Sequence, residues 1–285
     1  PKAYLNELMM DDNSGQPSAK EVFDTTPYTI LVVDDNPDMT DFLKRTFEGY
    51  FKRIIIAGDG VEALQLVRSH VPDIIVSDVM MPRMNGYKLC KTIKEDINIS
   101  HIPVILLTAR DDRQSQISGY KNGADGYLSK PFEVEMLMEL IRNRLKNREY
   151  TKKRYLNAGL IPTPEESTIS LTDETFLIKL NSIIQENIEN SNLGIQFICQ
   201  EVGLGRSSLY NKLKALTGMG ANEYISKLRI EKAITLISGT DMPFSEIAEK
   251  TGFTTPSYFS TAFKQYTGET PSQYKERKKK GLADK

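Results

Sequence analysis

The chain has 285 residues, of which 39% are hydrophobic and 26% are charged, and its formal net charge is −1. These values are typical of a soluble protein with folded cores, and the length favours two domains of ordinary size. No apolar run approaches the roughly 20 residues of a membrane span and no signal peptide opens the chain, so we expect a cytoplasmic protein without membrane contact. The two cysteines, Cys90 and Cys199, are far apart in the sequence and fall in different predicted domains, which favours reduced core thiols over a metal-binding pair.

Residues 1–27 are polar and rich in turn-forming residues, without a sustained period, so we predict an N-terminal tether. The chain begins with Pro1. This start is equally consistent with a piece of a longer protein and with removal of an initiator methionine.

Residues 28–148 alternate apolar runs with helical patterns five times. Such alternation predicts an α/β doubly wound domain around a five-stranded parallel sheet. We expect strands near residues 28–33, 53–57, 73–77, 103–107 and 126–128, and helices beginning near Pro37, Gly60, Gly86, Asp111 and Glu133.

Polar residues follow four of the predicted strands, namely Asp34 with Asp35, Asp78, Thr108, and Lys130 with Pro131. Because the carboxyl ends of parallel strands meet at one sheet edge, these side chains are expected to converge. Three carboxylates together need a hard cation, and oxygen ligands suit Mg²⁺. Asp78, alone on the central strand, is the candidate nucleophile that would form an acyl phosphate, with Lys130 and Mg²⁺ neutralising the phosphoryl oxygens. Each of these residues alone could be a helix cap or a solvated charge. Their shared position at the strand ends favours a phosphoryl-transfer site.

Several motifs, in this order, resemble the response-regulator receiver domain of two-component signalling: Asp34-Asp35, Asp78 with Met81-Pro82 and Gly86, Thr108-Ala109, and Lys130-Pro131-Phe132. The resemblance implies a flavodoxin-like fold over residues 28–148, with Asp78 accepting phosphate from a histidine kinase. It also implies Mg²⁺ held by Asp34, Asp35, Asp78 and the backbone carbonyl of Met80, switch positions at Thr108, Tyr127, Lys130 and Pro131, and a cis Lys130–Pro131 bond.

Residues 149–175 are first basic and then rich in proline, serine and threonine, so they are predicted to be a linker. The basic run could touch DNA phosphate, although a solvated helix end is favoured. Residues 176–285 carry 15 Lys and Arg against 11 Asp and Glu, a net +4, while residues 1–175 carry −5. A basic second module suggests that it meets a polyanion.

Two segments of this second module, residues 195–225 and 244–275, echo each other. Each predicts a short apolar helix, a glycine (Gly203 or Gly252) and an amphipathic helix closed by Thr-Gly, which together form a helix-turn-helix unit. A single helical hairpin is common in helical domains, whereas two copies favour DNA binding. The helix predicted between them, residues 222–238, is about 25 Å long. It would place the recognition helices about 34 Å apart, in successive major grooves.

The second unit resembles an AraC-type DNA-binding domain through Gly252-Phe253, Ser257-Tyr258-Phe259, Phe263-Lys264, Gly268, and Thr270-Pro271 with Tyr274. The resemblance covers roughly residues 177–278. It implies an all-α domain over residues 176–285 whose DNA contacts are Arg206, Ser207, Tyr210, Asn211 and Lys214 in the first unit, and Pro256, Ser257, Ser260, Thr261 and Lys264 in the second. Thr261 departs from the arginine common at that position. Leu209, Leu213, Phe259 and Phe263 are expected to be core, and Tyr210 has the alternative of packing on the connecting helix.

Together the modules predict a phosphorylation-switched, sequence-specific transcription regulator, not an enzyme beyond the phosphoryl chemistry at Asp78. Expected partners are promoter DNA, a histidine kinase fused upstream or in trans, and a second copy of the phosphorylated chain. Such an arrangement also occurs at the C-terminal end of hybrid sensors, in which case the parent chain could be membrane-anchored. Two alternatives remain: a receiver-bearing adaptor, and a phosphatase-like enzyme using Asp78, against which Met80 argues because haloacid-dehalogenase-type enzymes keep a second Asp there.

Overall fold

The computed structural model describes residues 23–109, 123–157 and 170–283. The first module contains strands β1 (Thr29–Val33), β2 (Arg53–Ala57), β3 (Ile74–Asp78), β4 (Val104–Ala109) and β5 (Gly126–Lys130). They form one sheet in the order β2-β1-β3-β4-β5, and all four pairings are parallel. The predicted five-stranded parallel sheet is therefore confirmed. The helix expected to begin near Asp111 lies outside the described residues.

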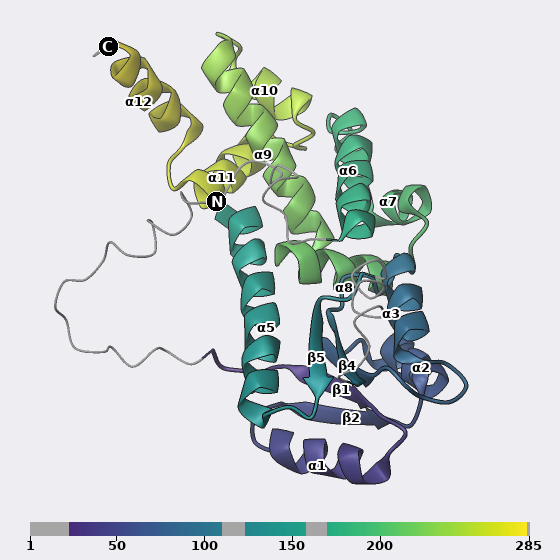
Figure 1. Cartoon of the computed structure of the whole chain (residues 1–285). Coiled ribbons are helices and arrows are strands. Elements are labelled where there is room, and N and C mark those ends of the chain that lie inside the picture. The colour runs from purple at the N-terminus through teal and green to yellow at the C-terminus, as the bar shows by residue number, and fades with distance from the viewer. Residues whose placement is uncertain (1–22, 110–122, 158–169, 284–285) are drawn as a thin grey trace, which may run out of the picture.

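The sheet separates two apolar layers, because successive strand residues point to opposite faces. On one face, Leu31 and Ile75 pack against helices α2 (Gly60–His70) and α3 (Gly86–Glu95). On the other face, Ile30 and Ile74 pack against α1 (Pro37–Phe47) and α5 (Val134–Asn157). Helices thus cover both faces (Figure 1), as a sheet with continuous apolar strands requires.

The second module is helical throughout the described residues. Its helices are α6 (Leu171–Glu186), α7 (Ile195–Val202), α8 (Arg206–Thr217), α9 (Ala221–Gly239), α10 (Phe244–Lys250), α11 (Pro256–Thr267) and α12 (Pro271–Ala283). One core joins α6, α7, α8 and the first half of α9, and a second core joins the rest of α9 to α10, α11 and α12. The single helix predicted between the two helix-turn-helix units is α9, and it is confirmed.

Two segments differ from the expectation of flexible connections. Helix α5 continues to Asn157, so part of the stretch predicted as a linker is helical. Tyr155 of this helix is buried in the first core of the second module. Helix α6 begins at Leu171 because Ser170 caps it by accepting a hydrogen bond from the Asp173 amide. At the N-terminus, Thr25 is buried and donates to the Tyr50 carbonyl at 2.7 Å, so the end of the predicted tether packs on the sheet module. The domain boundaries themselves stay predictions.

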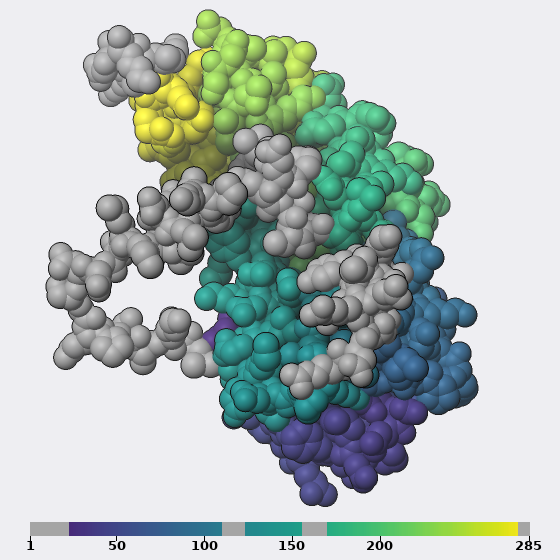
Figure 2. Space-filling model, viewed as in Figure 1, coloured from purple at the N-terminus to yellow at the C-terminus, as the bar shows by residue number. Residues whose placement is uncertain are grey.

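The molecule is elongated, with the sheet module at one end and the second helix-turn-helix unit at the other (Figure 2). The two modules are in direct contact, since α8 lies against α5. Among the residues described, none of the helices combines the length and the apolarity needed to cross a bilayer.

Gly252, which follows α10, lies where the backbone of the second core approaches the backbone of the first. Its φ is +70°, and a Cβ there would lie 2.2 Å from the carbonyl oxygen of Ile188, just beyond α6. Gly203 holds the matching position after α7, with φ +74°, but a Cβ there would meet no atom within 4 Å. The glycine after α7 is needed for its backbone conformation only, whereas Gly252 also permits a close approach of two backbones.

We expect Gly203→Ala to lower the free energy of unfolding by about 1–2 kcal/mol, the cost of a left-handed alanine. Gly252→Ala should cost at least about 3 kcal/mol, because a backbone clash is added to the same strain. Urea unfolding followed by circular dichroism measures both changes. Equal losses for the two variants would show that the contact with Ile188 contributes nothing.

Candidate functional site

The carboxyl edge of the sheet gathers the residues predicted from the strand ends. Asp78 ends β3 and is 7% exposed, and Asp34, just after β1, is 3% exposed. Thr108 lies in β4 and is buried, and Lys130 ends β5 with a partly exposed side chain. Asp35 follows Asp34 and is exposed. The edge therefore holds two buried carboxylates, a hydroxyl and an ammonium side by side.

Lys130 holds the two buried carboxylates together. Its Nζ donates to Asp34 Oδ2 at 2.9 Å and to Asp78 Oδ1 at 2.5 Å. The second oxygen of Asp78, Oδ2, accepts from the backbone amide of Met80 at 2.5 Å. Both oxygens of Asp78 are thus oriented by hydrogen bonds. The Lys130–Pro131 bond is cis, as the resemblance implied.

The charges at this edge are only partly balanced. Burial raises the pKa of Asp78 above its ordinary value, and the hydrogen bond and charge of Lys130 oppose this without cancelling it. Burial alone would lower the pKa of Lys130, but its hydrogen bonds to Asp78 and Asp34 raise it. One ammonium faces two carboxylates, so a second cation would stabilise the ionised form of Asp78.

The donor set at the edge fits a hydrated divalent cation. Carboxylate and carbonyl oxygens are the ligands that Mg²⁺ prefers, and Mg²⁺ usually keeps several waters instead of entering an all-protein cage. Within the described ranges, no group of three or more His, Cys, Asp or Glu side chains is clustered tightly enough to hold a metal ion. An ion at this edge would take water and backbone oxygen as ligands beside the carboxylates.

The loop after β3 is held in place by contacts that the sequence did not predict. Asp59, 3% exposed, caps α2 by accepting from the amides of Val61 and Glu62, and it forms an ion pair with Arg83. The Gly86 amide donates to the Val79 carbonyl at 3.0 Å. The Asp-Gly sequence at the start of α2 is a recognisable N-cap signal that could have identified Asp59.

Two of the predicted switch residues, Thr108 and Tyr127, lie in different surroundings. The Thr108 hydroxyl donates only a long bond, 3.4 Å, to the carbonyl of Ala109. Tyr127 is half-buried and packs against the core on the α2 and α3 face of the sheet. The weak bond leaves the hydroxyl of Thr108 able to turn toward a new acceptor.

The predicted DNA-contact residues divide into two groups by exposure. Arg206, Ser207, Tyr210 and Lys214 on α8, and Pro256, Ser257, Thr261 and Lys264 on α11, are exposed. Tyr210 is 54% exposed and its ring lies close to Gly220, just before α9, so contact with DNA and packing on the connecting helix both stay predictions. Asn211 and Ser260 are half-buried. Leu209, Leu213, Phe259 and Phe263 are buried, as expected for core positions.

Comparison with known proteins agrees with this architecture. Residues 30–142 match the response regulator receiver domain and residues 198–277 match a helix-turn-helix domain. Response regulator MprA of Mycobacterium sp. (strain KMS) is 36% identical over 53% of this chain and 70% of its own length. The chain belongs to the response-regulator family. This response regulator combines a receiver domain with an AraC-type DNA-binding domain, a composition typical of non-enzymatic regulators.

Two further relatives of this response regulator extend the comparison. Histidine kinase P4 of Formosa agariphila is 41% identical over 87% of this chain, which spans only 18% of the kinase's length. The structure of the Francisella response regulator 1452 receiver domain is 37% identical, covers 42% of this chain and 98% of its own, and has a TM-score of 0.39. Receiver and helix-turn-helix domains in general have histidine kinases and DNA as partners, and receiver domains generally use Mg²⁺.

Lys130→Met should lower the free energy of unfolding by about 1–3 kcal/mol, because Asp34 and Asp78 lose their shared counter-charge while the site stays partly solvated. Exposed Lys52→Met is the control and should change it by less than about 0.5 kcal/mol. Added magnesium chloride should restore much of the loss in Lys130→Met, since the ion replaces the missing ammonium. Thermal unfolding with and without the salt measures this. If magnesium stabilises neither the wild type nor the variant, these carboxylates do not bind the ion.

Proposed function

We propose that this response regulator is a phosphorylation-switched, sequence-specific transcription regulator and that Asp78 is its phosphoacceptor. The observation that carries the proposal is the position of Asp78: it ends the central strand, both of its oxygens are oriented, and the ammonium of Lys130 lies 2.5 Å away. A phosphoryl group attached there would add about −1.5 to −2 charge next to a residue already held in a polar network.

In the proposed reaction, a carboxylate oxygen of Asp78 attacks the phosphorus of a phosphohistidine. The new oxygen–phosphorus bond forms as the phosphorus–nitrogen bond breaks, and the electron pair leaves with the imidazole. Lys130 neutralises charge on the phosphoryl oxygens, and the Thr108 hydroxyl can donate to the new group. Asp34, Asp35, Asp78 and the Met80 carbonyl would hold Mg²⁺, which supplies further charge neutralisation when bound.

The partners follow from the same proposal. The phosphoryl donor is a histidine kinase, either fused upstream or acting in trans. The acceptor chain acts on promoter DNA in the cytoplasm, and it forms a homodimer when it is phosphorylated. A phosphatase-like use of Asp78 has less support, because Met80 offers no second acid and its side chain is 73% exposed.

Asp78→Asn should abolish labelling by acetyl phosphate or by a partner kinase, since an amide is not nucleophilic toward phosphorus. Asp38→Asn, at an exposed position in the first turn of α1, is the matched control and should label like the wild type. Mass spectrometry of the intact protein, before and after hydroxylamine cleaves any acyl phosphate, measures the labelling. Labelling of Asp78→Asn at the wild-type rate would contradict the assignment of Asp78 as the phosphoacceptor.

On DNA, we expect α8 and α11 to enter two successive major grooves. Asparagine can pair with adenine through two hydrogen bonds, which is worth about 1–3 kcal/mol of discrimination. We therefore expect Asn211→Ala to relax the preference at one position of the first half-site. Lys264→Ala, on the exposed face of α11, should weaken all sequences alike and lower the salt slope by about one unit.

Selection from random oligonucleotides, followed by salt-dependent binding, distinguishes the two effects. An unchanged selected motif for Asn211→Ala would mean that the first unit reads bases through other residues.

A further inference from the structure

A cavity of about 90 Å³ lies where the receiver meets the DNA-binding domain. Helix α5 contributes one wall, the segment between α3 and β4 contributes a second, and the start of α6 with the end of α8 forms the third. Pro103 and Asp125, which precede β4 and β5, also line the cavity, so it lies at the amino edge of the sheet. Strand β4 has six residues and spans roughly 20 Å, which separates the cavity from the Asp78 edge.

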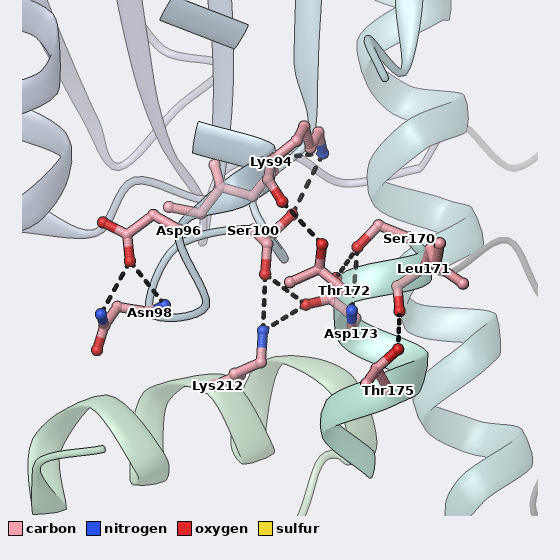
Figure 3. A network of polar contacts seen from close by, with 11 residues as sticks. Lys94, Asp96, Asn98, Ser100, Ser170, Leu171, Thr172, Asp173, Thr175 and Lys212 are labelled. Carbon is pink, nitrogen blue, oxygen red and sulfur yellow. Dashed lines mark hydrogen bonds and ion pairs between the residues drawn. The ribbon is translucent and has the colours of Figure 1, made fainter. Parts of the chain in front are cut away.

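A network of hydrogen bonds holds the walls of this cavity in place. Lys212 is completely buried, and its Nζ donates to Ser100 Oγ at 2.8 Å and forms an ion pair with Asp173. The Ser170 hydroxyl donates to Asp173 Oδ2 at 2.8 Å, and Lys94 Nζ donates to the Ser100 carbonyl at 3.3 Å. Figure 3 shows these side chains gathered between the two modules. The cavity is therefore bounded by oriented polar groups.

The cations around the cavity outnumber the acids that pair with them. Three ion pairs balance three of the cations, namely Lys94 with Asp125 at 2.7 Å, Arg148 with Asp73 at 3.5 Å, and Lys212 with Asp173. Arg144 also lines the cavity and is only partly exposed, but it has no acidic partner among the residues described. One positive charge is thus left over in a partly enclosed space, where an anion is attracted more strongly than in open solvent.

Three residues that line the cavity carry buried nitrogen atoms without a hydrogen-bond partner in the described part of the chain: Nδ1 of His101, Nε of Arg144 and Nε of Arg148. His101 is 8% exposed, and a buried polar group without a partner costs about 1–3 kcal/mol. Burial lowers the pKa of His101 to about 3, and the charges of Arg148 and Lys212 act in the same direction, so the ring is neutral. A ligand rich in acceptor oxygens would give these groups the partners that they lack.

The same cavity offers one acceptor. Oδ2 of Asp125 both pairs with Lys94 and accepts from the Val104 amide at 2.7 Å, whereas Oδ1 has no donor among the described residues. Inorganic phosphate keeps a proton at neutral pH and can donate it to a carboxylate, whereas sulfate can only accept. A volume of about 90 Å³ is several times the roughly 10–15 Å³ that one water needs, so an ion of this size fits.

We propose that this cavity binds inorganic phosphate, with Arg144, Arg148 and His101 donating to its oxygens and Asp125 accepting from its hydroxyl. The site goes beyond the phosphoryl transfer proposed for Asp78, because it holds a free anion at the opposite edge of the sheet and forms no covalent bond. Its walls belong to both modules, so bound phosphate adds to the contact between them and stabilises the folded chain.

Imidazole NMR signals test the site, because the chain has only two histidines, His101 beside the cavity and His70 at an exposed position of α2. The whole chain is titrated with sodium phosphate at constant pH and ionic strength, without magnesium. We expect the ring signals of His101 to shift and saturate while those of His70 stay unchanged. Sulfate, which has no proton to donate to Asp125, should bind at least about tenfold more weakly.

Variants of α5 test the role of the cation that has no acidic partner. Arg144→Gln should weaken phosphate binding at least about tenfold, since it removes both the charge and the donors. Lys146→Gln, at an exposed position of the same helix, removes the same charge and is the matched control, which should bind like the wild type. Arg144→Lys keeps the charge and should lose less than Arg144→Gln. Phosphate should also raise the Tm of the wild type and of Lys146→Gln more than that of Arg144→Gln.

Several outcomes would overturn the proposal. His101 signals that stay unchanged throughout the titration would mean that the cavity binds no phosphate. Equal weakening by Arg144→Gln and Lys146→Gln would reduce the effect to general attraction by a basic helix. Equal binding of sulfate would remove the role given to Asp125, and with it the assignment to phosphate.

Glycerol 3-phosphate distinguishes free phosphate from a phosphate ester. It should bind more weakly than phosphate, because its carbon chain adds bulk that the cavity does not accommodate; tighter binding would assign the site to an ester and overturn the proposal. Urea unfolding verifies that each variant is folded, and Arg144→Lys carries the test if Arg144→Gln is not. Labelling of Asp78 does not enter these measurements, so the phosphate site and the proposed function can fail independently.

Discussion

A charge removed from water has to be matched by an opposite charge, and this constraint shapes both regions on which the chain depends. At the sheet edge, Lys130 lies between Asp34 and Asp78. At the module interface, Lys212 lies between Asp173 and Ser100. Removing either lysine would leave carboxylates in a poorly solvated place, which is far more costly than losing an exposed ion pair. Each lysine therefore fixes the relative position of elements that are distant in the sequence.

The contacts of Lys130 could be predicted from the sequence, but those of Lys212 could not. Lys130 follows an apolar strand, and parallel strands bring their carboxyl ends to one edge, so its approach to Asp78 could be predicted from topology alone. Lys212 lies on a helix with apolar neighbours at helical spacing, where a lysine normally indicates the solvent face. Its partners are 39 and 112 residues away, and no periodic pattern connects them. Contacts between modules follow from surface shape, which local sequence patterns do not encode.

The two helix-turn-helix units could be predicted from local sequence patterns. Each repeat carries its own glycine and its own apolar spacing, and the helix between them, α9, contributes buried residues to both cores. The junction at Gly252 was not predictable in full, because the sequence indicates a turn there but not its close approach to Ile188. The burial of Tyr155 near the end of α5 was also missed, since the basic composition of residues 149–157 suggested a helix end in solvent.

That long α5 helix has a mechanical consequence. Its 24 residues span about 36 Å, from the receiver face that holds Leu137 to the first core of the DNA-binding domain, where Tyr155 is buried and its carbonyl accepts from Lys227. A helix of this length behaves as a lever arm. Tilting it by about 10° at the receiver end would displace the far end by about 6 Å, roughly one helical turn. A small rearrangement near the sheet would thus become a large translation of the DNA-binding domain, without any change in the fold of either part.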